Sequence, residues 1–163
     1  MLAKSETKQS SAETIVAHTK ELLARHAQLK VLYPQALSEK EWQLLYDAAY
    51  YHDVGKANTK FQNKLRVKEE RLSDPLPSLP EVPHAYLSCA YMPPIAELLK
   101  KYSKNEVRIL LMAVYYHHER DEEKIEETKQ ILLFDLPQYV EILAKDFHIR
   151  PTLKLDYTQL VDK

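Results

Sequence analysis

The sequence predicts an all-α fold, and three observations lead to this prediction. The 163 residues include a single glycine, Gly55, whereas β-hairpins, sandwiches and phosphate-binding loops depend on glycine for positive φ angles. The nine prolines stand between segments whose apolar residues recur with helical spacing. Hydrophobic residues make up 45% of the chain and charged residues 29%, a balance that supports a packed core and argues against wholesale disorder. We therefore expect one compact helical bundle.

The first two predicted helices begin at capping boxes. A Ser-x-x-Glu box at residues 10–13 precedes an apolar helical pattern that ends before Pro34. A second box at residues 38–41 begins a helix that we expect to reach His52. Gly55 follows closely, and we expect it to end this helix as a C′ residue.

The rest of the chain predicts one long loop and five further helices. A basic stretch at 56–71 precedes a segment with four prolines, which we expect to be extended. The five helices are expected over 84–91, from Pro94 through Leu99, from a capping box at 103–106 through His118, over 121–134 and over 137–147.

Composition excludes several kinds of protein. The chain has one cysteine, which rules out a disulfide framework and a cysteine-based zinc ribbon, and a lone thiol fits a reducing compartment. No window approaches the ~20 apolar residues of a membrane span, and the first residues lack the apolar region of a signal peptide. We therefore expect a cytoplasmic protein without a membrane partner. Because the formal net charge is −1, any contact with nucleic acid must come from a local basic patch.

Six side chains form a candidate metal-binding constellation. They are His18, His52, Asp53, His84, His117 and His118. A single histidine on an apolar helix face is usually a core residue, and an isolated His-Asp dipeptide is a weak signal. The full set, in this order in a glycine-poor helical chain, indicates a metal site. Imidazole suits Zn, Fe, Ni, Co and Mn, and a carboxylate shifts the preference towards harder ions such as Mg. We expect one or two divalent ions, because a pair can activate water for phosphodiester cleavage.

These residues carry a resemblance to a known family. The segment His52-Asp53-Val54-Gly55-Lys56 resembles the His-Asp-x-Gly-Lys signature of the HD phosphohydrolase superfamily. More specifically, residues 2–120 resemble the HD nuclease domain of the CRISPR-associated type I interference helicase-nuclease. The motifs that carry this second likeness are Leu2-Ala3-Lys4-Ser5, Thr14, His18-Thr19, Gly55-Lys56-Ala57, Phe61-Gln62, His84 with Ser88, and His117-His118. The resemblance implies a compact all-helical HD domain with a metal site between its helices.

The resemblance also implies roles for the site residues. One ion would be held by His18, His52 and Asp53. A second ion would share Asp53 as a bridge and add the three remaining histidines, His84, His117 and His118. The catalytic residues would be Asp53 and Lys56, the lysine contacting the scissile phosphate.

One family feature is missing from this pattern. Members of the family place a further aspartate, a ligand of the first ion, on a late helix, and no aspartate here stands in that setting. Either Asp156 substitutes for it or the ligand lies beyond the end of the chain. We therefore expect residues 1–163 to form a single HD nuclease domain that is incomplete at its C-terminus or is a fragment of a longer nuclease-helicase.

The basic stretch is the candidate contact for nucleic acid. Residues 56–71 hold six basic residues against two acidic ones, and we assign Lys60, Lys64, Arg66 and Lys68 to the contact with a phosphate backbone. The alternative is that these side chains form a solvated helix face.

The leading hypothesis is a metal-dependent phosphodiesterase, a deoxyribonuclease that cuts single-stranded DNA with little sequence preference. The resemblance implies a role in CRISPR type I antiviral defence, with a helicase domain or subunit and an RNA-guided surveillance complex as partners. One alternative is an HD phosphohydrolase that acts on nucleotides or cyclic nucleotides, which the His-His pair and the open proline-rich loop disfavour. Another is a catalytically weakened metal-binding module, which the missing late aspartate leaves open.

Overall fold

The computed structural model describes residues 1–4, 12–118, 124–149 and 151, and these residues are mainly helical. The α-helices are α1 Ile15–Leu32, α2 Glu39–Tyr51, α3 Thr59–Lys64, α4 His84–Tyr91, α5 Ile95–Lys101, α6 Lys104–Tyr115, α7 Ile125–Phe134 and α8 Val140–Phe147. The 3-10 helices are η1 Val54–Lys56, η2 Lys68–Glu70 and η3 Leu136–Gln138. The strands β1 Leu2–Lys4 and β2 Glu13–Thr14 pair as one antiparallel ribbon. The predicted all-α class is confirmed, with this ribbon as a small addition.

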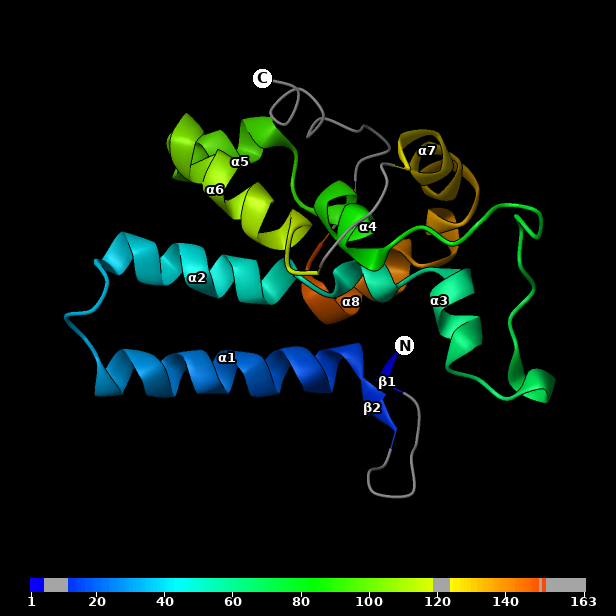
Figure 1. The fold of residues 1–163 in the computed structure, drawn as a ribbon, viewed down its shortest axis with the longest axis horizontal. Helices are drawn as coiled ribbons and strands as arrows, with labels where there is room; N and C mark the ends of the chain where they lie inside the picture. Colours follow the sequence, from blue (N-terminus) through cyan, green and yellow to red (C-terminus); the bar gives the residue numbers. More distant parts are fainter. Residues whose placement is uncertain (5–11, 119–123, 150, 152–163) are drawn as a thin grey trace.

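Helix α4 forms the centre of the bundle. Every residue from Ala85 to Tyr91 is buried, and the helix packs against η1, α6 and α7. Helices α1 and α2 form a long antiparallel pair on one side, α5 and α6 lie next to α2, and α3 and α7 lie at the opposite end (Figure 1). None of the described helices combines the length and the apolar character needed to traverse a bilayer.

Two of the predicted capping boxes are confirmed. The hydroxyl of Ser38 accepts the Glu41 amide at 3.3 Å, and the Ser38 amide donates to the Glu41 carboxylate at 2.7 Å. Ser103 and Glu106 repeat this arrangement at the start of α6. A cap of this kind stabilises a helix by about 1 kcal/mol, because it satisfies amides that have no partner in the first turn.

The predicted start of the first helix is wrong. Helix α1 begins at Ile15, and its N-cap is Thr14, whose hydroxyl accepts the Ala17 amide at 3.1 Å. Glu13 lies in β2 opposite Lys4. Pairing with β1 holds this segment extended, so the cap comes after the strand. The other half of the predicted box, Ser10, lies outside the described residues.

Three other boundaries differ from the prediction. Helix α6 ends at Tyr115, so the His117-His118 pair follows the helix and is not part of it. Neighbouring residues within a helix point about 100° apart, and leaving the helix frees both imidazoles from that constraint. Helix α7 begins at Ile125, and residues 119–123 lie outside the described part of the chain. The last predicted helix divides into η3 and α8.

Gly55 does not end α2 in the predicted manner. It lies inside η1, and no glycine of the chain has a positive φ. A Cβ at this position would lie 1.9 Å from the His84 carbonyl oxygen and 2.4 Å from the Ser88 nitrogen. Glycine is required here because the backbone of α4 passes directly against η1.

The replacement Gly55→Ala is therefore expected to lower the free energy of unfolding by about 3 kcal/mol or more, since the clash is with backbone that cannot rotate away. Urea denaturation measures this value. The control Ala27→Ser adds one heavy atom at an exposed position of α1 and is expected to stay within about 0.5 kcal/mol of the parent chain. A Gly55→Ala variant as stable as this control would contradict the close-approach explanation.

Buried polar side chains connect the segments around η1. The Gln62 carboxamide accepts the Leu2 amide at 2.9 Å and donates to the carbonyls of Leu2 and Lys56, both at 2.9 Å. The Asp135 carboxylate accepts the Thr59 amide at 2.7 Å and the Thr59 hydroxyl at 2.6 Å. Since unpaired buried amides are costly, these contacts fix the N-terminal strand and α3 relative to η1.

Candidate metal centre

The structure brings the six predicted ligands together from four parts of the chain. His18 lies on α1, His52 and Asp53 directly follow α2, His84 is the first residue of α4, and His117 and His118 follow α6. The side chains meet beside η1, the short helix that the glycine contact holds against α4. Residues up to a hundred positions apart in sequence therefore share one site.

The carboxylate of Asp53 lies at the middle of this cluster. Its Oδ2 atom is 3.4 Å from His18 Nε2 and 3.3 Å from His52 Nε2. Its Oδ1 atom is 3.2 Å from His84 Nε2 and 3.8 Å from His117 Nε2. Each oxygen thus faces a different pair of imidazoles, which is the arrangement of a carboxylate able to bridge two cations.

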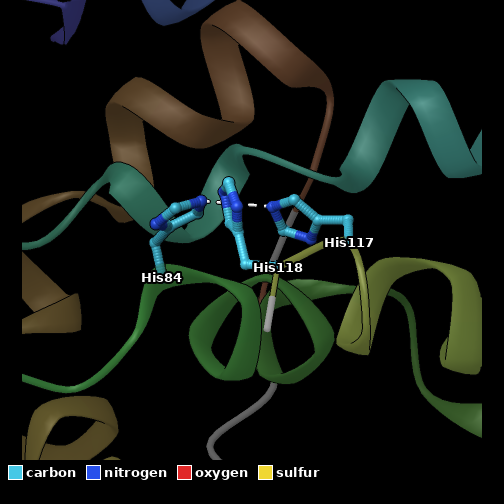
Figure 2. A group of neighbouring side chains, drawn as sticks. All are labelled: His84, His117 and His118. Atoms are coloured by element: carbon cyan, nitrogen blue, oxygen red, sulfur yellow. Dashed lines mark hydrogen bonds between the residues drawn. The ribbon is translucent and has the colours of Figure 1, made fainter. Parts of the chain in front are cut away.

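The three later histidines form a compact group of their own. Figure 2 shows His84 at the start of α4 and the rings of His117 and His118 next to it. The Nε2 atoms of His84 and His117 lie 3.2 Å apart, and the His118 ring centroid lies 4.9 Å from that of His84 and 4.3 Å from that of His117. Burial, together with the two neighbouring rings, lowers the pKa of His117 to about 4. Its ring is therefore neutral at pH 7, the form that binds metals.

Main-chain carbonyls hold two of the rings in a metal-binding orientation. His52 Nδ1 lies 2.8 Å from the Ala49 carbonyl oxygen, and His117 Nδ1 lies 2.6 Å from that of Val114. Since a carbonyl oxygen only accepts, each Nδ1 carries the hydrogen, and the lone pair of a neutral ring is on Nε2. In both residues Nε2 is the atom that faces Asp53.

Two imidazoles and a lysine keep the buried carboxylate of Asp53 ionised. Asp53 is 2% exposed, and Lys56 donates to its Oδ2 at 2.6 Å. Burial alone would raise the pKa of Asp53. Contacts with the His52 and His84 imidazoles and with the Lys56 ammonium outweigh burial and hold that pKa far below its usual range. The Lys56 ammonium is itself buried and lies 5.6 Å from the centroid of the Phe61 ring.

The donor atoms fit divalent cations in two groups. The first donor group is His18, His52 and Asp53, and the second donor group is His84, His117 and His118. Within each group all ligand atoms lie within 4.8 Å of one another. Imidazole nitrogens with a carboxylate oxygen are suitable ligands for first-row divalent metals. The two groups contain the six side chains that the resemblance implies, with Asp53 grouped with His18 and His52 alone. Metal ligation by these residues, including the bridging role of Asp53, stays a prediction.

The late aspartate has no counterpart in the described part of the cluster. Asp135 is buried but bonds to Thr59, and Asp146 is exposed on α8. Neither belongs to the two donor groups. The predicted substitute, Asp156, lies outside the described residues.

One acidic residue next to the cluster, Glu13, is not among the predicted site residues. The Glu13 carboxylate lies 3.3 Å from His18 Nδ1 and 3.0 Å from Lys4 Nζ. The local pattern assigns Glu13 to a capping box, and only the pairing of β2 with β1 brings it behind the His18 ring. No pattern within a short window contains that signal.

Two further side chains hold the segment that carries the ligands. The Ser88 hydroxyl accepts the Gly55 amide at 2.9 Å and donates to the His52 carbonyl at 2.7 Å. The Asn58 carboxamide donates to the Gly55 carbonyl at 2.7 Å. Side chains thus pair with both the amide and the carbonyl of Gly55. They hold the turn from α2 into η1 in place where main-chain hydrogen bonds of a regular helix are not available.

Part of the basic stretch is engaged in ion pairs. Lys60 Nζ lies 2.7 Å from Asp74 Oδ2, and Lys64 Nζ lies 2.7 Å from Glu81 Oε2. Both acidic partners lie in the predicted proline-rich loop, so these two lysines fasten that loop to α3. The Lys60 pair is largely shielded from solvent, whereas the Lys64 pair is exposed.

The other two predicted contacts to nucleic acid are placed differently. Lys68 is exposed in η2, and no described acidic residue pairs with it. Arg66 is half-buried, and its Nε atom has no hydrogen-bond partner among the described residues.

An uncharged side chain also holds the proline-rich loop against α3. The Asn63 carboxamide accepts the Leu72 amide at 2.7 Å and donates to the Leu72 carbonyl at 2.9 Å.

Comparison with known families gives a match that covers most of the chain. Residues 8–150 match the family described as Cas3, HD domain. The matched region contains all six cluster residues, together with Glu13 and Lys56. Neither the curated proteins nor the solved structures include a significant match.

The cluster is expected to bind divalent cations, and His84→Ala is expected to weaken Mn²⁺ binding by more than about tenfold, because a ring that faces both Asp53 and His117 is lost. Calorimetric titration measures the affinity. The matched control is His26→Ala, since His26 bonds to the Trp42 carbonyl on the α1–α2 pair, outside both donor groups. Equal affinities for the two variants would contradict the assignment of His84 as a ligand.

Proposed function

The chain belongs to the Cas3 HD domain family, a family of CRISPR-associated, metal-dependent hydrolases, and from this premise we propose that it hydrolyses the phosphodiester bonds of single-stranded DNA with little sequence preference. The observation that supports the proposal best is the arrangement around Asp53, where two donor groups face opposite oxygens of one buried carboxylate. Two cations held in this way are suited to phosphate esters, in which both the attacking and the leaving oxygen develop charge.

The residues of the chain have distinct roles in this proposal. Bound divalent ions supply the Lewis acidity for phosphodiester hydrolysis. Asp53 connects the two donor groups and orients them towards each other. Lys56 offsets the negative charge on the non-bridging phosphate oxygens, a role that suits a compact ammonium. Since Lys56 is 9% exposed, its charge acts in a medium less polar than water and therefore acts more strongly.

The donor set favours some metals over others. The two donor groups together contain five imidazoles and a single carboxylate, and imidazole nitrogen suits Mn, Fe, Co, Ni and Zn better than Mg, which prefers oxygen ligands. We therefore propose a first-row transition metal as the ion of this site. The second donor group, made of three imidazoles, carries this preference most strongly.

The basic stretch is the proposed path of the DNA strand. Among the residues assigned to it, Lys68 and Arg66 are the best placed, since neither has a described acidic partner. Contacts from Lys60 or Lys64 would require breaking the ion pairs that fasten the loop. We propose that a helicase domain or subunit delivers the strand, within an RNA-guided surveillance complex, to this chain acting as one HD nuclease domain.

The parent chain loaded with Mn²⁺ is expected to cut circular single-stranded DNA. Asp53→Ala is expected to lower the cleavage rate by more than about a hundredfold, because both donor groups lose their shared carboxylate. Gel analysis of the circular substrate measures the rate. Asp53→Asn, which keeps the side-chain volume, is expected to show the same loss.

The control for this experiment is Asp146→Ala, which removes an exposed carboxylate from α8 and is expected to leave the rate unchanged. Far-UV circular dichroism confirms that each variant keeps its helices. Cleavage retained in Asp53→Asn would overturn the mechanism. Hydrolysis of nucleotides or cyclic nucleotides by the parent chain, without DNA cleavage, would favour the nucleotide phosphohydrolase. Metal binding with no turnover of any of these substrates would favour the metal-binding module.

The salt dependence of DNA binding distinguishes lysines that contact phosphate from lysines that form ion pairs with the proline-rich loop. In the Asp53→Asn background, Lys68→Ala is expected to reduce the slope of log K against log salt by about 0.7, the value for one contact to a single strand. Lys60→Ala is expected to leave the slope unchanged, because its ammonium is paired with Asp74. Fluorescence anisotropy measures both slopes.

The control for the salt titration is Lys145→Ala, which removes an exposed cation on α8 that is not part of the basic stretch 56–71. An unchanged slope for Lys68→Ala would remove Lys68 from the proposed DNA path. A reduced slope for Lys60→Ala would mean that this lysine leaves Asp74 to bind phosphate.

A further inference from the structure

We propose that Glu13 is a positioning residue for the first donor group, acting through His18 from the side of the ring opposite Asp53. The inference rests on the proposed function only in that the cluster holds divalent ions. Glu13 belongs to neither donor group, and it reaches the site because β2 lies directly before α1. Its carboxylate is 3.3 Å from His18 Nδ1, while His18 Nε2 is 3.4 Å from Asp53.

The partner of Nδ1 distinguishes His18 from the other ligands. His52 and His117 donate from Nδ1 to carbonyls three residues earlier in their own segments, so the backbone fixes their rings. His18 instead faces a carboxylate from a separate element. A carboxylate behind an imidazole selects the tautomer with its lone pair on Nε2 and increases the donor strength of that atom. The orientation of the His18 ring therefore depends on the Glu13 side chain, which a mutation can change without altering the backbone.

The N-terminal ribbon holds Glu13 in position. Lys4 lies opposite Glu13 in the β1–β2 pairing, and its ammonium is 3.0 Å from the same carboxylate. The Gln62 carboxamide anchors β1 by bonding both main-chain groups of Leu2. The Glu13 side chain is 21% exposed against 61% for Lys4, so the carboxylate is turned inward. The ribbon thus connects the N-terminus to the metal centre through one side chain.

The geometry makes the expected effect selective. The second donor group draws its orientation from the Val114 carbonyl and from the contact between His84 and His117, and Glu13 touches neither. Loss of the Glu13 carboxylate should therefore weaken binding at the first donor group alone. A general loss of stability would weaken binding at both groups.

The experiment is a titration of the full chain with Co²⁺, followed by visible absorption, because the d–d bands report the ligand field of each bound ion. Glu13→Gln is expected to weaken one of the two binding steps about tenfold, and Glu13→Ala is expected to weaken the same step by up to about a hundredfold. The other step is expected to keep its affinity and spectrum. Glutamine loses less because its amide oxygen still accepts from Nδ1.

A double-mutant cycle assigns the affected step. Glu13→Gln combined with His18→Ala is expected to bind no more weakly than His18→Ala alone, because Glu13 acts only through that ring. The matched control is Glu21→Gln on α1, whose carboxylate pairs with Arg25 and belongs to neither donor group. Thermal unfolding without metal checks that each variant folds.

Three outcomes would overturn the inference: unchanged affinity in Glu13→Gln, an equal loss at both steps, or no Co²⁺ binding by the parent chain. The readout is independent of the proposed function, because it contains no DNA. A parent chain that fails to cut DNA, while Glu13→Gln still weakens one step, would refute the proposed nuclease activity and support the role of Glu13.

Discussion

The buried carboxylate of Asp53 is the constraint around which the other parts of the structure are arranged. An isolated ion at this depth would cost several kcal/mol in lost hydration, and here one ammonium and four imidazole nitrogens surround it. Those groups come from α1, the turn into η1, the first residue of α4 and the turn after α6. Because the partners of the buried carboxylate come from separate elements, the packing of the helices and the geometry of the site depend on each other.

Local sequence rules accounted for the helices and for the chemistry of the ligands. The boxes at Ser38 and Ser103 were predictable because every group in them lies within four residues. The all-α class followed from the scarcity of glycine. The cluster was predictable because imidazoles and a carboxylate recur in a pattern that resembles a known family, and Cas3 HD membership confirms that resemblance.

Contacts between distant segments were not accessible in the same way. The sequence predicts that Gly55 ends a helix, whereas the constraint on this residue comes from the backbone of α4, some thirty residues later in the chain. The sequence fits Glu13 to a capping box. Strand β1, which pairs with β2 and so places Glu13 beside His18, lies outside that four-residue pattern. The sequence shows that Lys60 is basic, but it does not show that Asp74 pairs with it. In each of these three cases the prediction lacked a contact with a residue outside the short sequence pattern. Such contacts depend on the fold and cannot be deduced from neighbouring residues in the sequence.

The spacing of the ligands along the chain has a thermodynamic consequence. His18, the His52-Asp53 pair, His84 and His117 follow one another at intervals of roughly thirty residues, so a cation that joins any two of them closes a loop of moderate length. An ion that binds the folded chain and not the unfolded one stabilises the fold by mass action, whereas a covalent cross-link acts by restricting the denatured ensemble. In a chain with a single thiol, ions at the centre would take the place of disulfides and connect the α1–α2 pair to α4 and the turn after α6. The same atoms would then serve both the architecture and the reaction.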